Sequence, residues 1–148
     1  MSKSKKILIA VMAACLILSG LWLYWEWEMP ISDLIPEEKW MRLELRQEEE
    51  AGTGLQRELE VPLEPVLAQM KETRVTRRRE DRSLDEGRVQ LLLYKGEAYP
   101  TMLYAEPDGT IHIAEELDFD HWKCYEGGEE LYEFLVANSR ELPEKDSP

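Results

Sequence analysis

The chain has 148 residues, of which 33% are charged and 43% are hydrophobic, and its formal net charge is −13. These values exclude a disordered chain and a protein embedded wholly in a membrane, and they leave room for one globular domain of about 100 residues. Three of the 18 basic residues and none of the 31 acidic residues lie in the first 25 positions, so the remainder carries a net charge of −16. This acidity disfavours nonspecific nucleic-acid binding and a domain that lies flat on anionic lipid.

An uncharged apolar segment covers residues 7–25. As a helix that rises about 1.5 Å per residue, it spans nearly the full hydrocarbon thickness of a bilayer. We expect a transmembrane anchor that begins at Ile7 and ends in an aromatic cluster with Trp22 and Trp25, which suit the headgroup interface. The alternative is a buried core helix, but a helix that is apolar on every side needs a larger protein around it.

The charges that flank this segment predict its orientation. Lys3, Lys5 and Lys6 precede it, whereas Glu26 and Glu28 follow it. Because basic residues next to a span stay in the cytoplasm, we expect a single-pass protein of the cell membrane with a cytoplasmic N-terminus and an extracytoplasmic body.

The two cysteines are Cys15, within the apolar segment, and Cys124, in the body. A thiol inside a membrane cannot easily reach a folded external domain, so we expect no internal disulfide. Residues 12–15 resemble part of a lipobox, so lipidation of Cys15 is an alternative to a small apolar residue within the span. A cleavable signal peptide is disfavoured, because the apolar run continues through residues 21–24 and no A-x-A site occurs.

The rest of the chain divides into a tether at residues 26–39, a domain at residues 40–142 and a polar tail at residues 143–148. The tether contains two prolines and has no sustained periodicity. The expected strands cover residues 40–46, 55–61, 73–79, 88–94, 99–105 and 110–114, and the expected helices cover residues 62–72 and 129–139. The predicted fold class is α+β: an N-terminal transmembrane helix followed by a small, mostly antiparallel sheet with two helices.

The last three expected strands should form an antiparallel meander, with a turn at Pro107-Asp108-Gly109 in which the glycine takes a positive φ. In the strand after this turn, Ile111 and Ile113 should face inward and His112 outward. Apolar residues at helical spacing predict the inner stripes of the two helices. These stripes are Leu63, Val66, Leu67 and Met70, and then Leu131, Phe134, Leu135 and Asn138.

This order of elements resembles that of small membrane-anchored or lipoprotein domains of unknown function in Gram-positive bacteria, the DUF5301 type. The matching features are Val66-Leu67 and Met70 in the first helix, Cys124-Tyr125, and Leu131-Tyr132 in the last helix. The resemblance covers most of the chain after residue 40. It implies no catalytic residues, and the lack of a clear lipobox departs from the lipoprotein members.

The segment 118–124 is the best metal-binding candidate in the sequence. Its Asp118, Asp120, His121 and Cys124 side chains are of types that ligate divalent ions. The H-x-x-C spacing stands alone, and His112 would join it only if the fold brings it close. The alternative is a loop of solvated carboxylates.

A basic cluster stands out in the acidic body. It consists of Arg74, Arg77, Arg78, Arg79 and Arg82. The first four are candidates for binding an anionic partner, or the cluster pairs with the acidic segment 115–133. The alternative is an edge strand whose charges deter pairing with other sheets.

Motifs for nucleophilic or metal-dependent catalysis are missing: the sequence has no G-x-S-x-G, no H-E-x-x-H and no phosphate-binding glycine loop. We therefore assign no catalytic residue and no cofactor. The favoured function is a membrane-tethered, extracytoplasmic interaction or regulatory domain without catalytic activity, with a protein partner at the membrane or cell wall. The alternatives are a lipoprotein-type solute- or wall-binding domain and a small metal-dependent hydrolase that uses residues 118–124.

Overall fold

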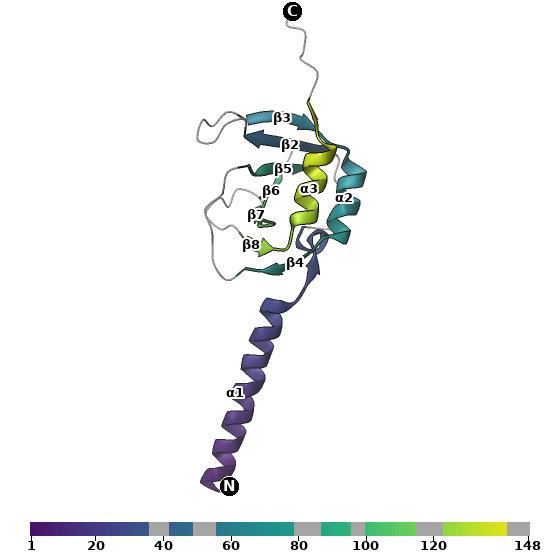
Figure 1. The fold of residues 1–148 in the computed structure, drawn as a ribbon. Coiled ribbons are helices and arrows are strands. Elements are labelled where there is room, and N and C mark those ends of the chain that lie inside the picture. The colour runs from purple at the N-terminus through teal and green to yellow at the C-terminus, as the bar shows by residue number, and fades with distance from the viewer. Residues whose placement is uncertain (36–41, 49–55, 79–86, 96–99, 115–122, 142–148) are drawn as a thin grey trace, which may run out of the picture.

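A computed structural model of the chain describes residues 1–35, 42–48, 56–78, 87–95, 100–114 and 123–141. A long helix projects from a body in which two shorter helices lie side by side on one face of an antiparallel sheet (Figure 1). This arrangement confirms the predicted α+β class.

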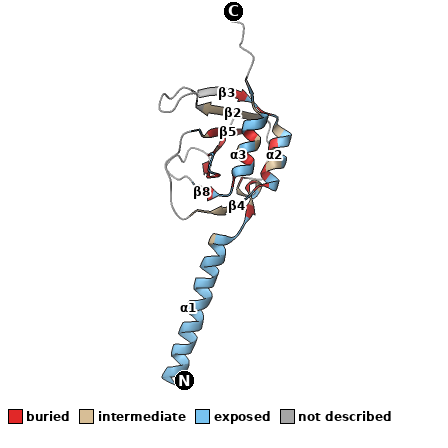
Figure 2. Cartoon of the chain, in the orientation of Figure 1, coloured by how far each residue is buried: buried red, intermediate tan, exposed pale blue. Residues whose placement is uncertain are grey.

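The first helix, α1 (Lys3–Glu26), is 24 residues long and begins at Ser2, whose side chain accepts a hydrogen bond from the Lys5 backbone N–H. None of its residues is buried, and Figure 2 shows it exposed except at its last turn, where Trp25 is half-buried. It is long and apolar enough to cross a membrane. Because no residue of α1 is buried against the described body, α1 is not a core helix of that body.

All strand pairs in the sheet are antiparallel, and the order of the strands is β1-β4-β8-β7-β6-β5-β2-β3-β9 among the described residues. The strands are β1 (Met29–Pro30), β2 (Arg42–Glu48), β3 (Gln56–Glu60), β4 (Arg74–Arg77), β5 (Val89–Tyr94), β6 (Thr101–Ala105), β7 (Ile111–Ala114), β8 (Lys123–Glu126) and β9 (Arg140–Glu141). The predicted meander is confirmed, because β5 pairs with β6 and β6 with β7. Two long-range pairings, β2 with β5 and β4 with β8, extend the sheet on either side of β5–β8.

Helices α2 (Leu63–Glu72) and α3 (Glu129–Asn138) cover one face of this sheet (Figure 1). The predicted stripes are buried at Val66, Met70, Leu131 and Leu135, which form one core with the inward strand residues. Asn138 was wrongly expected in the inner stripe. It is exposed, and its side-chain amide donates to the Phe134 carbonyl, as suits a polar residue in the last helical turn.

Part of the expected tether packs into the core. Residues 29–30 form β1 against β4, and a 3-10 turn, η1 (Ile31–Leu34), follows. Met29, Ile31 and Ile35 are buried, and the Ile31 N–H donates to the Thr73 carbonyl at 3.0 Å. The expectation of a free tether is therefore corrected for residues 29–35. Residues 36–41 lie outside the described part of the chain.

The turn between β6 and β7 anchors the start of α3. Gly109 takes φ +88°, which confirms the predicted turn, and its N–H donates to the Glu106 carbonyl at 3.0 Å. The Gly109 carbonyl accepts from Gly128 N–H at 2.8 Å, so the turn and the helix N-terminus are fixed to each other.

Candidate functional site

The face of the sheet opposite the two helices carries polar side chains that are nevertheless buried. On β5, β6 and β7, alternate residues such as Leu91, Leu103 and Ile111 join the core under the helices. The residues between them point to the other face, because side chains alternate along a strand. Gln90 and His112 lie on that face and are 8% and 3% exposed.

His112 corrects one prediction. It was expected to face outward, and it does point away from the helices, but it is buried. Alternation predicts which face a residue lies on, and it does not predict what covers that face. The fold brings His112 beside Cys124, its register partner on β8, with Nδ1 3.7 Å from the Cys124 Sγ.

Glu106 completes this array and was not anticipated from the sequence. It follows β6 directly, is fully buried, and places its Oε2 3.4 Å from His112 Nε2. The only sequence signal was its position before the Pro107-Asp108-Gly109 turn, which folds the chain back beside β7. The His112 imidazole therefore lies between the Cys124 thiol and the Glu106 carboxylate.

A histidine next to a cysteine is the arrangement in which a thiol can be activated as a nucleophile. Thiol chemistry on a substrate also requires access to the sulfur atom. Cys124 is only 7% exposed, so in this structure the array is a buried polar network of the core.

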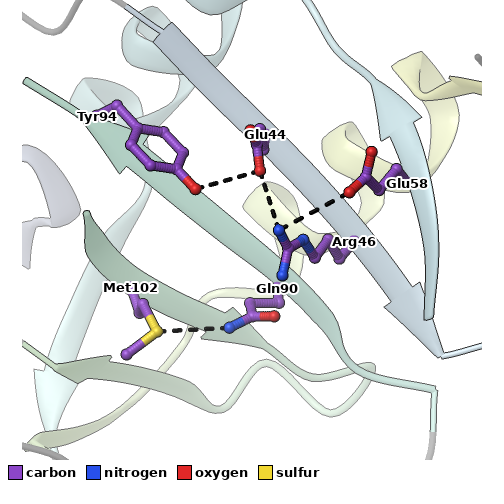
Figure 3. A network of polar contacts seen from close by, with 6 residues as sticks. All are labelled: Glu44, Arg46, Glu58, Gln90, Tyr94 and Met102. Atoms are coloured by element: carbon purple, nitrogen blue, oxygen red, sulfur yellow. Dashed lines mark hydrogen bonds and ion pairs between the residues drawn. The ribbon is translucent and has the colours of Figure 1, made fainter. Parts of the chain in front are cut away.

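A second polar network lies across β2, β3 and β5 (Figure 3). The Arg46 guanidinium contacts Glu44 at 3.2 Å and Glu58 at 3.8 Å, and the Tyr94 hydroxyl donates to Glu44 at 3.2 Å. These ion pairs are partly exposed, so each contributes little to stability.

Tyr104 on β6 lies between this network and Arg88. Burial raises the pKa of Tyr104 above its ordinary value of 10.0, and the charges of Arg88 and Arg46 oppose that rise. The Arg88 guanidinium lies 5.7 Å from the centre of the Tyr104 ring, in cation–π range. Burial likewise raises the pKa of Tyr132, whose hydroxyl donates to the Gly87 carbonyl at 2.9 Å.

The basic cluster lies on β4, next to the end of α1. The Arg77 guanidinium stacks 3.9 Å from the centre of the Tyr24 ring and donates to the Tyr24 carbonyl at 3.0 Å. Arg78 donates to the Thr110 hydroxyl at 3.0 Å, whereas Arg74 is exposed. Arg79 and Arg82 lie outside the described residues.

Other predicted residues are placed as follows. Lys3, Lys5, Lys6, Ile7, Cys15 and Trp22 are exposed on α1, and Trp25 is half-buried at its end. Of the metal candidates, Cys124 is paired with His112, and Asp118, Asp120 and His121 fall outside the described ranges. Within those ranges, no group of three or more side chains is arranged to hold a metal ion.

A depression of about 360 Å³ lies elsewhere, where β3, the end of α3 and β9 meet. Its lining is Glu60, Pro62, Ala137, Asn138, Ser139 and Arg140. The one hydroxyl in this lining belongs to Ser139, which donates to the Val136 carbonyl at 3.1 Å, and the lining contains no imidazole.

Comparison with known proteins identifies no relative: no family model, no curated protein and no solved structure matches the chain. The resemblance based on element order therefore stays a prediction.

Proposed function

We propose that the protein is a membrane-tethered, extracytoplasmic interaction or regulatory domain without catalytic activity of its own. The observation that carries the proposal is α1, a 24-residue apolar helix in which no residue is buried. Exposed apolar surface costs about 25 cal/mol per Å² in water, and the hydrocarbon of a bilayer removes this cost. At about 1.5 Å per residue, α1 is about 36 Å long, enough to cross a hydrocarbon core of about 30 Å.

The junction between α1 and the body supports a domain held close to the bilayer surface. Strand β1 begins at Met29, directly after α1 ends at Glu26, and Ile31 is buried in the core. Arg77 joins β4 to the last turns of α1. A domain held in this way has a high effective concentration toward other membrane proteins. This favours binding to such proteins and requires no active site.

Two measurements test this proposal. The full chain in isolated membranes should resist extraction by alkaline carbonate. Cross-linking in intact cells, followed by solubilisation and recovery of the chain, should repeatedly yield the same membrane or cell-wall partner. Extraction by carbonate would overturn the membrane anchor, and repeated failure to recover a specific partner would overturn the interaction role.

A second candidate, a metal-dependent activity, is favoured by one observation. His112 and Cys124, whose Nδ1 and Sγ atoms are 3.7 Å apart, are two side chains of the kind that zinc accepts. Asp118, Asp120 and His121 lie between β7 and β8 in the sequence. Elemental analysis of the purified full chain tests this candidate: stoichiometric metal that is lost in Cys124→Ala supports it, and a metal-free chain removes it.

A further inference from the structure

The C-terminal end of α1 lacks the residues that usually stabilise the end of a helix. Its last turn has no basic residue, and Glu26 and Glu28 place negative charge beside the negative end of the helix dipole. The carbonyl groups of the last turn also have no hydrogen-bond donor within the helix. A stabilising contact at this end therefore has to come from outside α1.

Arg77 of β4 supplies such a contact, although it follows Tyr24 by 53 positions in the sequence. Its Nη1 donates to the Tyr24 carbonyl at 3.0 Å, and its guanidinium lies 3.9 Å from the centre of the Tyr24 ring. One cation thus binds a carbonyl of the last turn, brings positive charge to the negative end of the helix and stacks on an aromatic ring. These are the roles of a C-terminal cap.

Arg77 is itself fixed in the sheet. It is half-buried and lies opposite Tyr125 in the β4–β8 pair, and the backbone N–H of Arg78 donates to the Cys124 carbonyl at 3.0 Å. On the other side of β4, the paired strand β1 begins at Met29, two residues after the C-cap of α1. The body is therefore joined to α1 twice, through the chain that enters β1 and through Arg77. The second attachment restricts the swing that the short linker alone would allow.

We propose that Arg77 is a positioning residue that caps α1 and holds the body at one fixed angle to the membrane span. This inference rests on the proposed span of α1, in which Tyr24 lies at the level of the lipid headgroups. The β1–β4 edge of the sheet then stays beside the membrane, and the β3–β9 edge is directed away from it (Figure 1). A membrane partner meets the body in a constant orientation, which lowers the ordering cost of binding.

The test measures the distance between a spin label on α1 and a spin label on the body by double electron–electron resonance. It uses the full chain in a lipid nanodisc, with both native cysteines replaced by alanine. The labels are attached at Ser19→Cys and Ala68→Cys, which are exposed positions of α1 and α2. This parent chain should give one narrow distance distribution.

Arg77→Ala should lose the narrow distribution and give a broad one, because it removes both the hydrogen bond and the stacking on Tyr24. Tyr24→Leu removes only the ring and leaves the sequence of the body unchanged, so it should broaden the distribution less than Arg77→Ala. Arg74→Ala is the matched control. It removes an exposed arginine from the same strand and should keep the narrow distribution.

A second pair of labels, at Ala68→Cys and Lys123→Cys, lies within the body and separates a change of angle from a loss of folding. This pair should stay narrow in every variant. If Arg77→Ala broadens it too, that variant has unfolded, and Tyr24→Leu then provides the comparison.

Two results would overturn the inference. One is a broad distribution between α1 and the body in the parent chain, and the other is a distribution in Arg77→Ala and Tyr24→Leu that is as narrow as in Arg74→Ala. Carbonate extraction separates the two proposals, because a chain that stays in the membrane while its body swings freely contradicts only this one.

Discussion

His112 lies between a thiol and a carboxylate, and all three side chains are buried, with His112 on the face of the sheet opposite α2 and α3. Buried polar groups are tolerated when they contact one another, and removal of one leaves the others without compensation. The contacts among Glu106, His112 and Cys124 therefore restrict the position of β7 relative to β8 and to the turn after β6. The burial of this array also bears on function, since a thiol acts as a nucleophile only where a substrate can reach it, and the Cys124 side chain is buried.

Cys124 should react with a thiol reagent only when the body unfolds. In the Cys15→Ala chain it is the sole thiol, and its side chain is buried. We expect modification by an aromatic disulfide reagent to be slow in native detergent solution and fast in urea. The control is Ala68→Cys, at an exposed position of α2, in a chain that lacks both native cysteines. Equal rates of modification at positions 124 and 68 in the native state would show that the Cys124 thiol is accessible. That result would support a thiol-dependent activity.

Tyr104 should make the domain less stable at alkaline pH. Its pKa is raised by burial in the folded state, so above about pH 10 the unfolded chain loses this proton while the folded chain keeps it. The unfolded state is then favoured as pH rises toward the folded-state pKa. Urea unfolding of the detergent-solubilised chain, followed by pulse proteolysis at pH 8 and pH 11, measures this. Tyr104→Phe should lose less stability between these two pH values than wild type. Equal losses in both chains would contradict the assignment.

For the segment from Met29 to Ile35, the prediction from the sequence differs most from the structure. A two-residue strand and a single 3-10 turn are too short to show a periodic pattern in the sequence. The prediction of a tether therefore rested on the two prolines. The burial of Met29, Ile31 and Ile35 makes the segment part of the core and brings α1 close to the sheet.

Ile31→Ala should destabilise the body by about 2–5 kcal/mol, the range for deleting a large, fully buried aliphatic side chain. Ile31 is 0% exposed, whereas Asp33, in the same turn, is exposed. Asp33→Ala, the matched control, should change the free energy of unfolding by less than about 0.5 kcal/mol. Pulse proteolysis in urea measures both variants. A small effect of Ile31→Ala on the free energy of unfolding would instead support the prediction that this segment is a tether.

Elements with a regular pattern were predictable. The β5–β7 meander and both helices of the body appear where alternation, apolar stripes and the Gly109 turn indicated. The pairings of β2 with β5 and β4 with β8 were not predictable, because they join strands far apart in the sequence. The same holds for the candidate site: Glu106, His112 and Cys124 meet only through β7–β8 pairing and the turn after β6.

At the scale of the whole molecule, charge is distributed along one axis. Lys3, Lys5 and Lys6 occupy the start of α1, and its uncharged apolar part follows. The acidic body lies at the other end of α1, where Arg77 of β4 contacts Tyr24. A lysine-rich start favours the cytoplasmic side, and an acidic body avoids the anionic cytoplasmic leaflet. Both effects favour the same orientation.

The orientation should therefore depend on the three lysines. A reporter active only outside the cytoplasm, fused after Pro148, should work in wild type, and external protease on protoplasts should degrade the body. Replacing Lys3, Lys5 and Lys6 with glutamine removes the charge bias and should lower the fraction of correctly oriented chains. The matched control replaces the same three with arginine, which keeps the charge and should leave that fraction unchanged. Full protection of the wild-type body, with activity of a cytoplasmic reporter, would reverse the assigned topology.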